Sequence, residues 1–147
     1  MRALLAAALL GLAAMPAAAD KPRHPLNPAY KAECGSCHVP YPAKRLPAQS
    51  WRELMARLDR HFGSDASLDA KMHEEISRYL AANAGRRDAP PGAEPRISET
   101  RWFHKEHDEV PAALWKSAAV KGAANCAACH TRAEDGDYSE RTLRLPK

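Results

Sequence analysis

The sequence predicts an all-α protein, and three observations support this fold class. Apolar residues recur at helical spacing in several segments, residues that cap helices precede some of these segments, and no segment alternates apolar and polar residues as a strand would. Large apolar side chains are nevertheless scarce. From Asp20 onward only 16 of 128 residues are Leu, Ile, Val or Phe. A chain with so few of them usually fails to build a core from side chains alone. We therefore expect a large bound group to complete the core.

The first 19 residues have the pattern of an export signal. Arg2 gives a charged start, residues 3–14 form an apolar run, and three alanines at 17–19 fit a cleavage site. The run is too short to span a bilayer. No later stretch approaches 18 consecutive apolar residues, so we expect a protein that is exported, cleaved after about Ala19 and not stably inserted in a membrane. Residues 20–147 are then the mature domain.

The first two helices are predicted at 51–62 and 68–83. Ser50 and Glu53 form a capping box before the first of them, and Gly63 would end it. Helical spacing then gives each helix one apolar face. The two faces consist of Trp51, Leu54, Leu58 and His61, and of Leu68, Met72, Ile76 and Tyr79. Segment 39–47, with three prolines, is predicted to be a loop.

Two further helices are predicted after a linker at 84–96 that is rich in proline, glycine and charge. The third helix begins near Ser98 or Thr100, ends before Pro111 and has an apolar face that includes Phe103 and His107. The fourth runs over 112–125, and the tail from 131 to 147 is polar and predicted to be extended. The linker would divide the mature chain into two lobes, roughly 20–85 and 97–147.

All four cysteines fall in two copies of one pentapeptide pattern. Residues 34–38 read CGSCH and residues 126–130 read CAACH. The pattern C-x-x-C-H attaches a c-type haem, because each thiol can add to one vinyl group and the adjacent histidine can bind the iron. We therefore expect two covalent haems c, one centred in each lobe of the helical fold. The thioether residues are Cys34, Cys37, Cys126 and Cys129, and the proximal iron ligands are His38 and His130.

Three other uses of these cysteines give a weaker account of the sequence. Two disulfides in an exported protein would not require a histidine after each pair. A zinc site made from both pairs would have to close a long gap and would not explain the sparse core. A thioredoxin-like redox motif would need a βαβ pattern, which the sequence lacks.

The second axial position of each iron decides what the protein can do. Histidine on both sides gives a closed, low-spin centre, whereas an open position permits small-molecule chemistry. His61 and His107 lie on apolar helix faces and are the predicted distal ligands. His104 is the main competitor of His107. The weaker candidates are His24, His73, Met55 and Met72.

Seven segments of the mature chain, in this order, are similar to those of a known family. They are CGSCH at 34–38, LPAQSW at 46–51, HFGSDASLD at 61–69, ISRYLAANA at 76–84, RIS at 96–98, WFHKEH at 102–107 and NCAACH at 125–130. The chain resembles the dihaem cytochrome c family of bacterial periplasmic electron carriers. The resemblance implies bis-histidine ligation of both irons, with His61 and His107 as distal ligands. It also implies a monohaem, oxygen-binding cytochrome c as electron acceptor and a membrane cytochrome b as a candidate donor.

The formal net charge of +4 has an explanation in the haems themselves. Two haems carry roughly four negative propionate charges, and their two ferric cores carry about two positive charges. Arginines are the natural partners of these carboxylates, so nucleic-acid binding receives no support. The candidates are Arg45, Arg52, Arg57, Arg60, Arg86, Arg87, Arg96 and Arg101.

These observations predict a monomeric, periplasmic electron carrier rather than an enzyme. Outer-sphere electron transfer requires no substrate bond to iron, and two distal histidines would leave no site for one. The alternative is a haem enzyme, gas binder or sensor in which one distal position is open or labile. A purely structural role for the haems is a third and more remote alternative.

Overall fold

The computed structural model describes residues 26–86, 89 and 95–146. The predicted export signal, His24 and part of the predicted linker lie outside this range. Within it, the chain forms five α-helices, six short 3₁₀-helices and four isolated bridges, with no strand. The predicted all-α class is therefore confirmed. No helix in the described ranges is long and apolar enough to cross a membrane.

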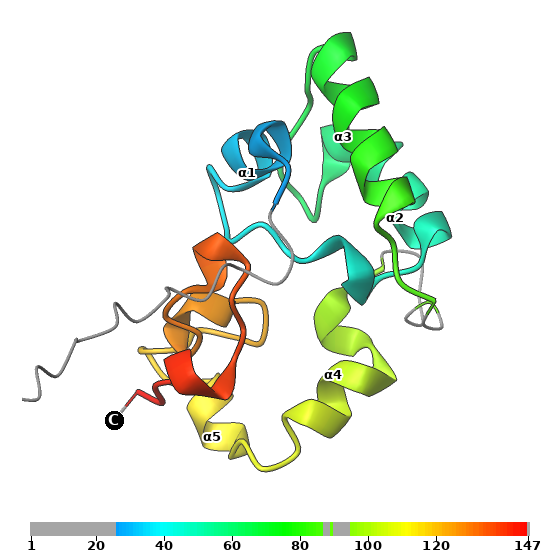
Figure 1. Cartoon of the computed structure of the whole chain (residues 1–147). Helices are drawn as coiled ribbons and strands as arrows, with labels where there is room; N and C mark the ends of the chain where they lie inside the picture. Colours follow the sequence, from blue (N-terminus) through cyan, green and yellow to red (C-terminus); the bar gives the residue numbers. More distant parts are fainter. Residues whose placement is uncertain (1–25, 87–88, 90–94, 147) are drawn as a thin grey trace, which may run out of the picture.

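The N-terminal half, residues 26–86, contains α1 (Pro28–Cys34), α2 (Ala48–Met55) and α3 (Ala70–Ala82), which lie in the upper part of Figure 1. Helix α1 was not predicted, although Asn27 and Pro28 are a recognisable start signal. The Asn27 side chain accepts a hydrogen bond from the Tyr30 amide, and proline suits the first helical turn. Helix α1 leads directly into the first C-x-x-C-H segment.

Helix α2 begins and ends earlier than the sequence predicted. It starts at Ala48 after the extended Pro47, so Ser50 lies inside the helix, wholly buried, and the predicted capping box is wrong. The helix stops at Met55, and a 3₁₀ turn at Leu58–Arg60 follows. Phe62 and Gly63 then have positive φ values of 49° and 92°. The chain turns here instead of continuing as one helix to residue 62.

Helix α3 agrees closely with the predicted helix at 68–83. The Asp69 carboxylate caps it by accepting hydrogen bonds from the amides of Lys71 and Met72. Of the predicted stripe, Ile76 is fully buried, and Leu80 one turn later is buried beside it. This helix packs along α2 and forms one wall of the N-terminal core.

The N-terminal core is a cluster of buried side chains from α1, α2, α3 and segment 39–47. Trp51 ties two of these parts together, because its indole N–H donates to the Ala43 carbonyl at 2.7 Å. Segment 39–47 is irregular apart from a 3₁₀ turn at Ala43–Arg45, as its prolines predicted, but it is largely buried. The cluster consists of Tyr30, Ala43, Leu46, Trp51, Met55, Ile76 and Leu80.

The C-terminal half, residues 95–146, contains α4 (Arg101–Glu106) and α5 (Ala112–Trp115). Thr100 caps α4 by accepting a hydrogen bond from the Phe103 amide, as one of the two predicted start sites. The predicted helix at 112–125 is wrong beyond residue 115. Ser117 and Asn125 instead form turn hydrogen bonds with the amide and carbonyl of Val120, which compete with a helix. Lys121 has a φ of 62°, which lies outside the range of a right-handed helix.

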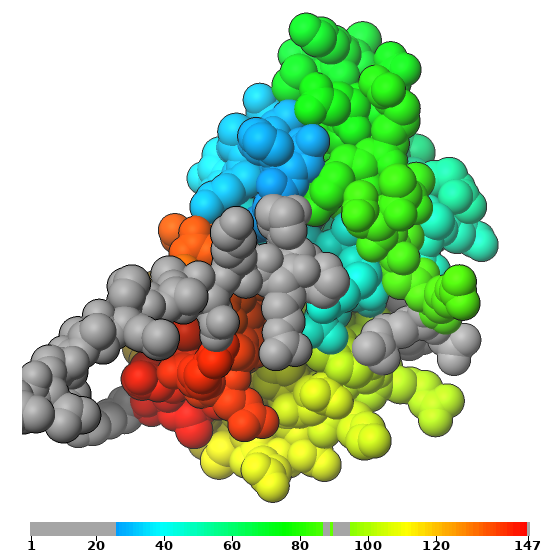
Figure 2. Space-filling view, in the orientation of Figure 1, coloured from blue at the N-terminus to red at the C-terminus, as the bar shows by residue number. Residues whose placement is uncertain are grey.

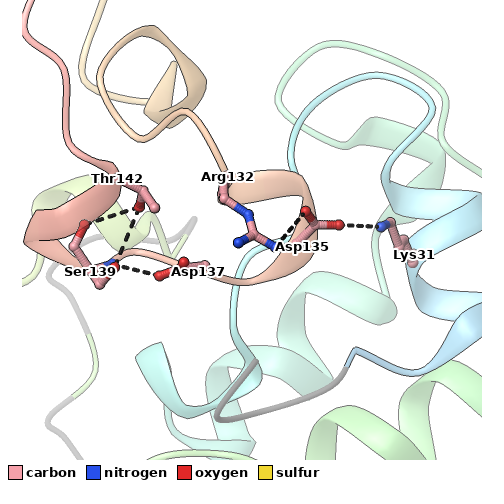
Figure 3. A network of polar contacts seen from close by, with 6 residues as sticks. All are labelled: Lys31, Arg132, Asp135, Asp137, Ser139 and Thr142. Atoms are coloured by element: carbon pink, nitrogen blue, oxygen red, sulfur yellow. Dashed lines mark hydrogen bonds and ion pairs between the residues drawn. The ribbon is translucent and has the colours of Figure 1, made fainter. Parts of the chain in front are cut away.

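The C-terminal tail is folded rather than extended, which corrects the prediction for 131–147. It contains 3₁₀ turns at Ala133–Asp135 and Glu140–Thr142, and a bridge joins His130 to Leu143. Figure 3 shows the polar contacts of this tail: Asp137 accepts from the Ser139 amide, and the Thr142 hydroxyl donates to the Ser139 carbonyl. The tail thereby returns the chain to the second C-x-x-C-H segment.

Polar contacts join the two halves. In Figure 2 orange atoms of the C-terminal half lie against blue and cyan atoms of the N-terminal half at the left of the view. Lys31 of α1 forms an ion pair with Asp135 at 3.2 Å (Figure 3). The Tyr41 hydroxyl donates to the Ala124 carbonyl at 2.8 Å. Ile97 adds an apolar contact against the N-terminal core. These contacts fix the first C-x-x-C-H segment relative to the second.

Candidate functional site

The first candidate site is formed by His38 and His61, whose ring centres are 6.2 Å apart with an angle of 24° between the ring planes. His38 closes the first C-x-x-C-H segment, and His61 follows the 3₁₀ turn Leu58–Arg60. The Nδ1 of His38 lies 2.8 Å from the Val39 carbonyl. A carbonyl only accepts, so Nδ1 carries the proton and the lone pair of Nε2 is available to a metal.

The turn after α2 places His61 opposite His38. The Ser64 amide donates to the His61 carbonyl at 3.0 Å, and Phe62 has a positive φ, which is uncommon for a residue with a side chain. Phe62 packs edge-on against His61, and Tyr41 stacks on His38 at 4.8 Å. A small hollow beside His61 is lined by Arg57 and Arg60 among others. Guanidinium groups of this kind would suit the carboxylates of a bound haem.

The second candidate site is formed by His107 and His130, also with ring centres 6.2 Å apart, but with ring planes at 77°. His107 directly follows α4, and its Nδ1 lies 2.9 Å from the Phe103 carbonyl. This contact again leaves the lone pair of Nε2 available to a metal. The Nδ1 of His130 is buried and has no hydrogen-bond partner within the described ranges. The two proximal histidines therefore differ in their backbone support.

Aromatic rings surround the second histidine pair. Phe103 stacks on His107 at 4.1 Å, and Trp115 lies 5.8 Å from the same ring. Tyr138 lies 5.2 Å from His130. Burial is the main cause that raises the pKa of the Tyr138 hydroxyl. The ring contacts of this pair are therefore made by aromatic side chains from three separate segments.

Both ring-to-ring distances fit an iron atom between two imidazoles. A metal–nitrogen bond of about 2.0–2.1 Å, added to roughly 1.1 Å from nitrogen to ring centre, separates two axial rings by about 6.3 Å. Both pairs match this separation. Cys34 and Cys37 lie beside the first pair in sequence, and Cys126 and Cys129 beside the second. The residues present therefore fit two covalently attached haems.

The cysteines do not fit the two competing uses well. The structure forms no disulfide among them. Burial raises the pKa of both Cys34 and Cys126 to about 11, with the Glu33 charge also contributing at Cys34. In the described parts of the chain, no three His, Cys, Asp or Glu side chains gather as a metal-ion site would need.

The surroundings of His130 favour its neutral form over its charged form. Burial lowers its pKa, and the charges of His107 and Arg45 lower it further, while Asp137 acts in the opposite direction. A neutral imidazole is the form that coordinates iron.

The remaining candidate ligands lie elsewhere. His104 is exposed on α4, one turn from the facing pair. His73 is half-buried, and its Nε2 lies 3.0 Å from the Met55 carbonyl. Met55 is part of the N-terminal core, and Met72 is half-buried on α3.

Sequence reasoning missed several residues that border the two pairs. Tyr41, Trp115 and Tyr138 pack close to histidine rings from segments predicted to be loop, helix and extended tail. No spacing in the sequence links them to a histidine, because each contact is made by the tertiary fold. The aromatic residue types alone were the available signal.

Comparison with known proteins gives a consistent result. Residues 30–138 match the family described as dihaem cytochrome c. The structure is similar to a diheme cytochrome c from Shewanella baltica OS155, with a TM-score of 0.71, 39% identity and coverage of 82% of this chain and 93% of that one. It is also similar to the diheme cytochrome c DHC from Rhodobacter sphaeroides, with a TM-score of 0.66, 47% identity and coverage of 76% and 96%. A search of curated proteins finds no significant match.

Proposed function

The chain belongs to the dihaem cytochrome c family, and from this premise we propose that its two haems c are each held between two histidines for electron transfer. His38 and His61 bind the first iron, and His130 and His107 bind the second. The observation that carries this assignment is the 6.2 Å separation of the rings in both pairs. It also pairs each distal histidine with a particular haem-binding segment.

The cysteines and histidines have separate tasks in this proposal. Cys34 and Cys37, and likewise Cys126 and Cys129, hold each haem by thioether bonds. Backbone carbonyls at Val39 and Phe103 orient His38 and His107 through Nδ1, a contact that fixes the ring and raises ligand basicity. Bound haem iron supplies one-electron chemistry at a potential set by its ligands, hydrogen bonds and burial.

Two histidines at each iron favour an electron carrier over an enzyme. With both axial positions taken, peroxide, nitrite or oxygen would have to displace a histidine before reacting. The Tyr41 contact with Ala124, close to Cys126, brings the surroundings of the first site to the second haem-binding segment. This proximity supports electron exchange within the chain.

The cellular setting of the proposal follows from the sequence and the family. Residues 1–19 have the pattern of an export signal, and covalent haems c fit a role for residues 20–147 in the periplasm. The two lobes at 20–85 and 97–147 would each hold one haem. Redox proteins are the partners: a monohaem cytochrome c as acceptor and a membrane cytochrome b as donor, with the carrier acting as a monomer.

Carbon monoxide binding tests the two distal ligands. We expect the reduced protein to bind it slowly or not at all at neutral pH, because a histidine must leave first. His61→Ala and His107→Ala should each convert one haem to a high-spin, carbon monoxide-reactive form. The exposed His104→Ala is the matched control on α4 and should change neither haem.

Two outcomes would contradict the proposal. Rapid, stoichiometric binding to the unaltered protein would show an open iron and favour the alternative of an enzyme or gas binder. A high-spin haem in His104→Ala, with His107→Ala unchanged, would show that the other histidine of α4 is the ligand.

A further inference from the structure

Tyr41 joins the first histidine pair to the second haem-binding segment. Its ring stacks on His38, with ring centres 4.8 Å apart and 18° between the ring planes. Its hydroxyl donates a hydrogen bond to the Ala124 carbonyl at 2.8 Å, across 83 residues of sequence. Ala124 lies two residues before Cys126. One side chain therefore contacts a proposed ligand of the first iron and the backbone that leads to a thioether residue of the second haem.

The Ala124 carbonyl also contacts Cys126 directly. It accepts a second hydrogen bond, from the Cys126 amide, at 3.1 Å, which the two lone pairs of a carbonyl oxygen allow. These contacts form the Tyr41 series, which runs from the His38 ring through Tyr41 and the Ala124 carbonyl to the amide and sulfur of Cys126. Apart from the stacking contact on His38, each step of the series is a covalent bond or a hydrogen bond.

The N-terminal core holds Tyr41 in place. The Tyr41 carbonyl accepts a hydrogen bond from the Tyr30 hydroxyl at 2.7 Å, and Tyr30 is a buried member of that core. Pro40 and Pro42, on either side of Tyr41, are also buried, and proline restricts its backbone to a narrow range of φ. The backbone that carries the Tyr41 ring is therefore fixed by side chains of the N-terminal half.

The ion pair between Lys31 and Asp135 also joins the halves, but it differs in kind. Its charged atoms are 3.2 Å apart, both side chains are about half exposed, and it contains no aromatic ring (Figure 3). A surface ion pair contributes little to stability, and its removal would leave the contacts of Tyr41 in place. The two contacts therefore allow mechanical joining of the halves to be separated from electronic coupling of the two sites.

We propose that Tyr41 is the bridge through which the two haems exchange electrons. This inference rests on the proposed function, because it takes His38 as an iron ligand and Cys126 as a thioether residue. Electronic coupling between two redox centres falls more steeply across a gap than through covalent and hydrogen bonds. The Tyr41 series therefore favours this route.

The exchange moves one electron and no atoms. The iron of one site is oxidised from ferrous to ferric while the iron of the other is reduced, and no covalent bond forms or breaks. Tyr41 keeps its proton, because an amide carbonyl accepts a hydrogen bond but is too weak a base to remove the proton. The phenol ring therefore couples the two sites without being oxidised itself.

The test is the rate of electron exchange within the half-reduced, haem-loaded protein, measured by nuclear magnetic resonance. Haem methyl protons have different chemical shifts in the ferric and ferrous states, so the averaging and widths of their signals report this rate. Dilution removes the contribution of exchange between molecules. Tyr41→Phe keeps the ring but removes the hydrogen bond to Ala124, and we expect the rate to fall severalfold. Tyr41→Leu also lacks the ring, and the rate should fall further.

Lys31→Gln is the matched control, because it removes a contact between the halves but leaves the Tyr41 series intact. Its exchange rate should equal that of the unaltered protein. Tyr41→Phe and Lys31→Gln should both keep two low-spin ferric signals in electron paramagnetic resonance, so a slower rate does not report a lost ligand. Redox titration of each variant gives the driving force, for which the rates are corrected.

An exchange rate in Tyr41→Phe equal to that of the unaltered protein, or an equal fall of the rate in Lys31→Gln, would overturn the inference. Failure of the proposed function would appear instead in the unaltered protein, as a high-spin or carbon monoxide-reactive haem.

Discussion

The N-terminal half buries a continuous group of side chains beside its histidine pair, whereas the C-terminal half surrounds its pair with aromatic rings. Seven buried residues form the N-terminal cluster. In the described C-terminal half the buried hydrophobic residues are Phe103, Val120 and Ala133. A core made of side chains can persist when a cofactor is lost, but a shell built around a cofactor cannot. The difference implies that the second haem contributes more to its half of the fold than the first.

The largest expected effect comes from removing each haem in turn. The double variant Cys126→Ala/Cys129→Ala should lose the second haem, and α4 and its surroundings should then unfold. Cys34→Ala with Cys37→Ala should cost the first haem but leave α3 packed on α2 through Ile76 and Leu80. Amide hydrogen exchange, read helix by helix, measures both results. Equal loss of protection in the two halves would remove the distinction.

A single truncation in the N-terminal core should have a smaller but clear effect. Ile76 is 0% exposed. We expect Ile76→Ala to lower the free energy of unfolding by about 2–5 kcal/mol, because the variant loses transfer free energy and leaves a cavity. Denaturant titration, followed by haem absorbance and circular dichroism, measures this change in the free energy of unfolding. Leu145→Ala is the control, because Leu145 is 58% exposed and its loss should change stability by less than about 0.5 kcal/mol. Similar values for both variants would mean that the N-terminal core carries little of the stability.

The smallest expected effect concerns the contact between the halves. Tyr41→Phe keeps the ring on His38 but removes the hydrogen bond to the Ala124 carbonyl, which should cost about 0.5–1.5 kcal/mol. The same titration measures this cost, and the ferric spectrum should not change. A loss of the low-spin signal from the first haem would show that the hydroxyl positions His38 rather than only joining the halves.

Sequence reasoning predicted the parts of the fold that depend on local pattern. The apolar periodicity of α3 predicted that helix well. The capping residue Thr100 predicted the start of α4, but the helix ends at Glu106 and not just before Pro111 as predicted. Sequence reasoning failed where the chain enters left-handed conformations at Phe62 and Lys121. Residues with a side chain such as phenylalanine and lysine rarely adopt a positive φ, so the residue type at these two positions does not predict the turn.

The candidate site also has some parts that local sequence pattern predicted and others that it did not. The two C-x-x-C-H patterns are contiguous and were readable as haem-binding segments. The choice of His61 relied on a helix shared with Trp51, which the structure replaces with a turn, although His61 still faces His38. The position of Arg45 at the second pair could not be predicted, because folding joins residues that are far apart in sequence.

The ferric electron paramagnetic resonance spectrum of the unaltered, haem-loaded protein is the most direct test of two histidine-paired irons. Ring planes at 24° and 77° should give two low-spin signals of unequal anisotropy, with the larger anisotropy from the His107–His130 site. No high-spin signal is expected at neutral pH, because both axial positions are filled. A stoichiometric high-spin signal from either haem would contradict the account, since it would show an iron without its second histidine.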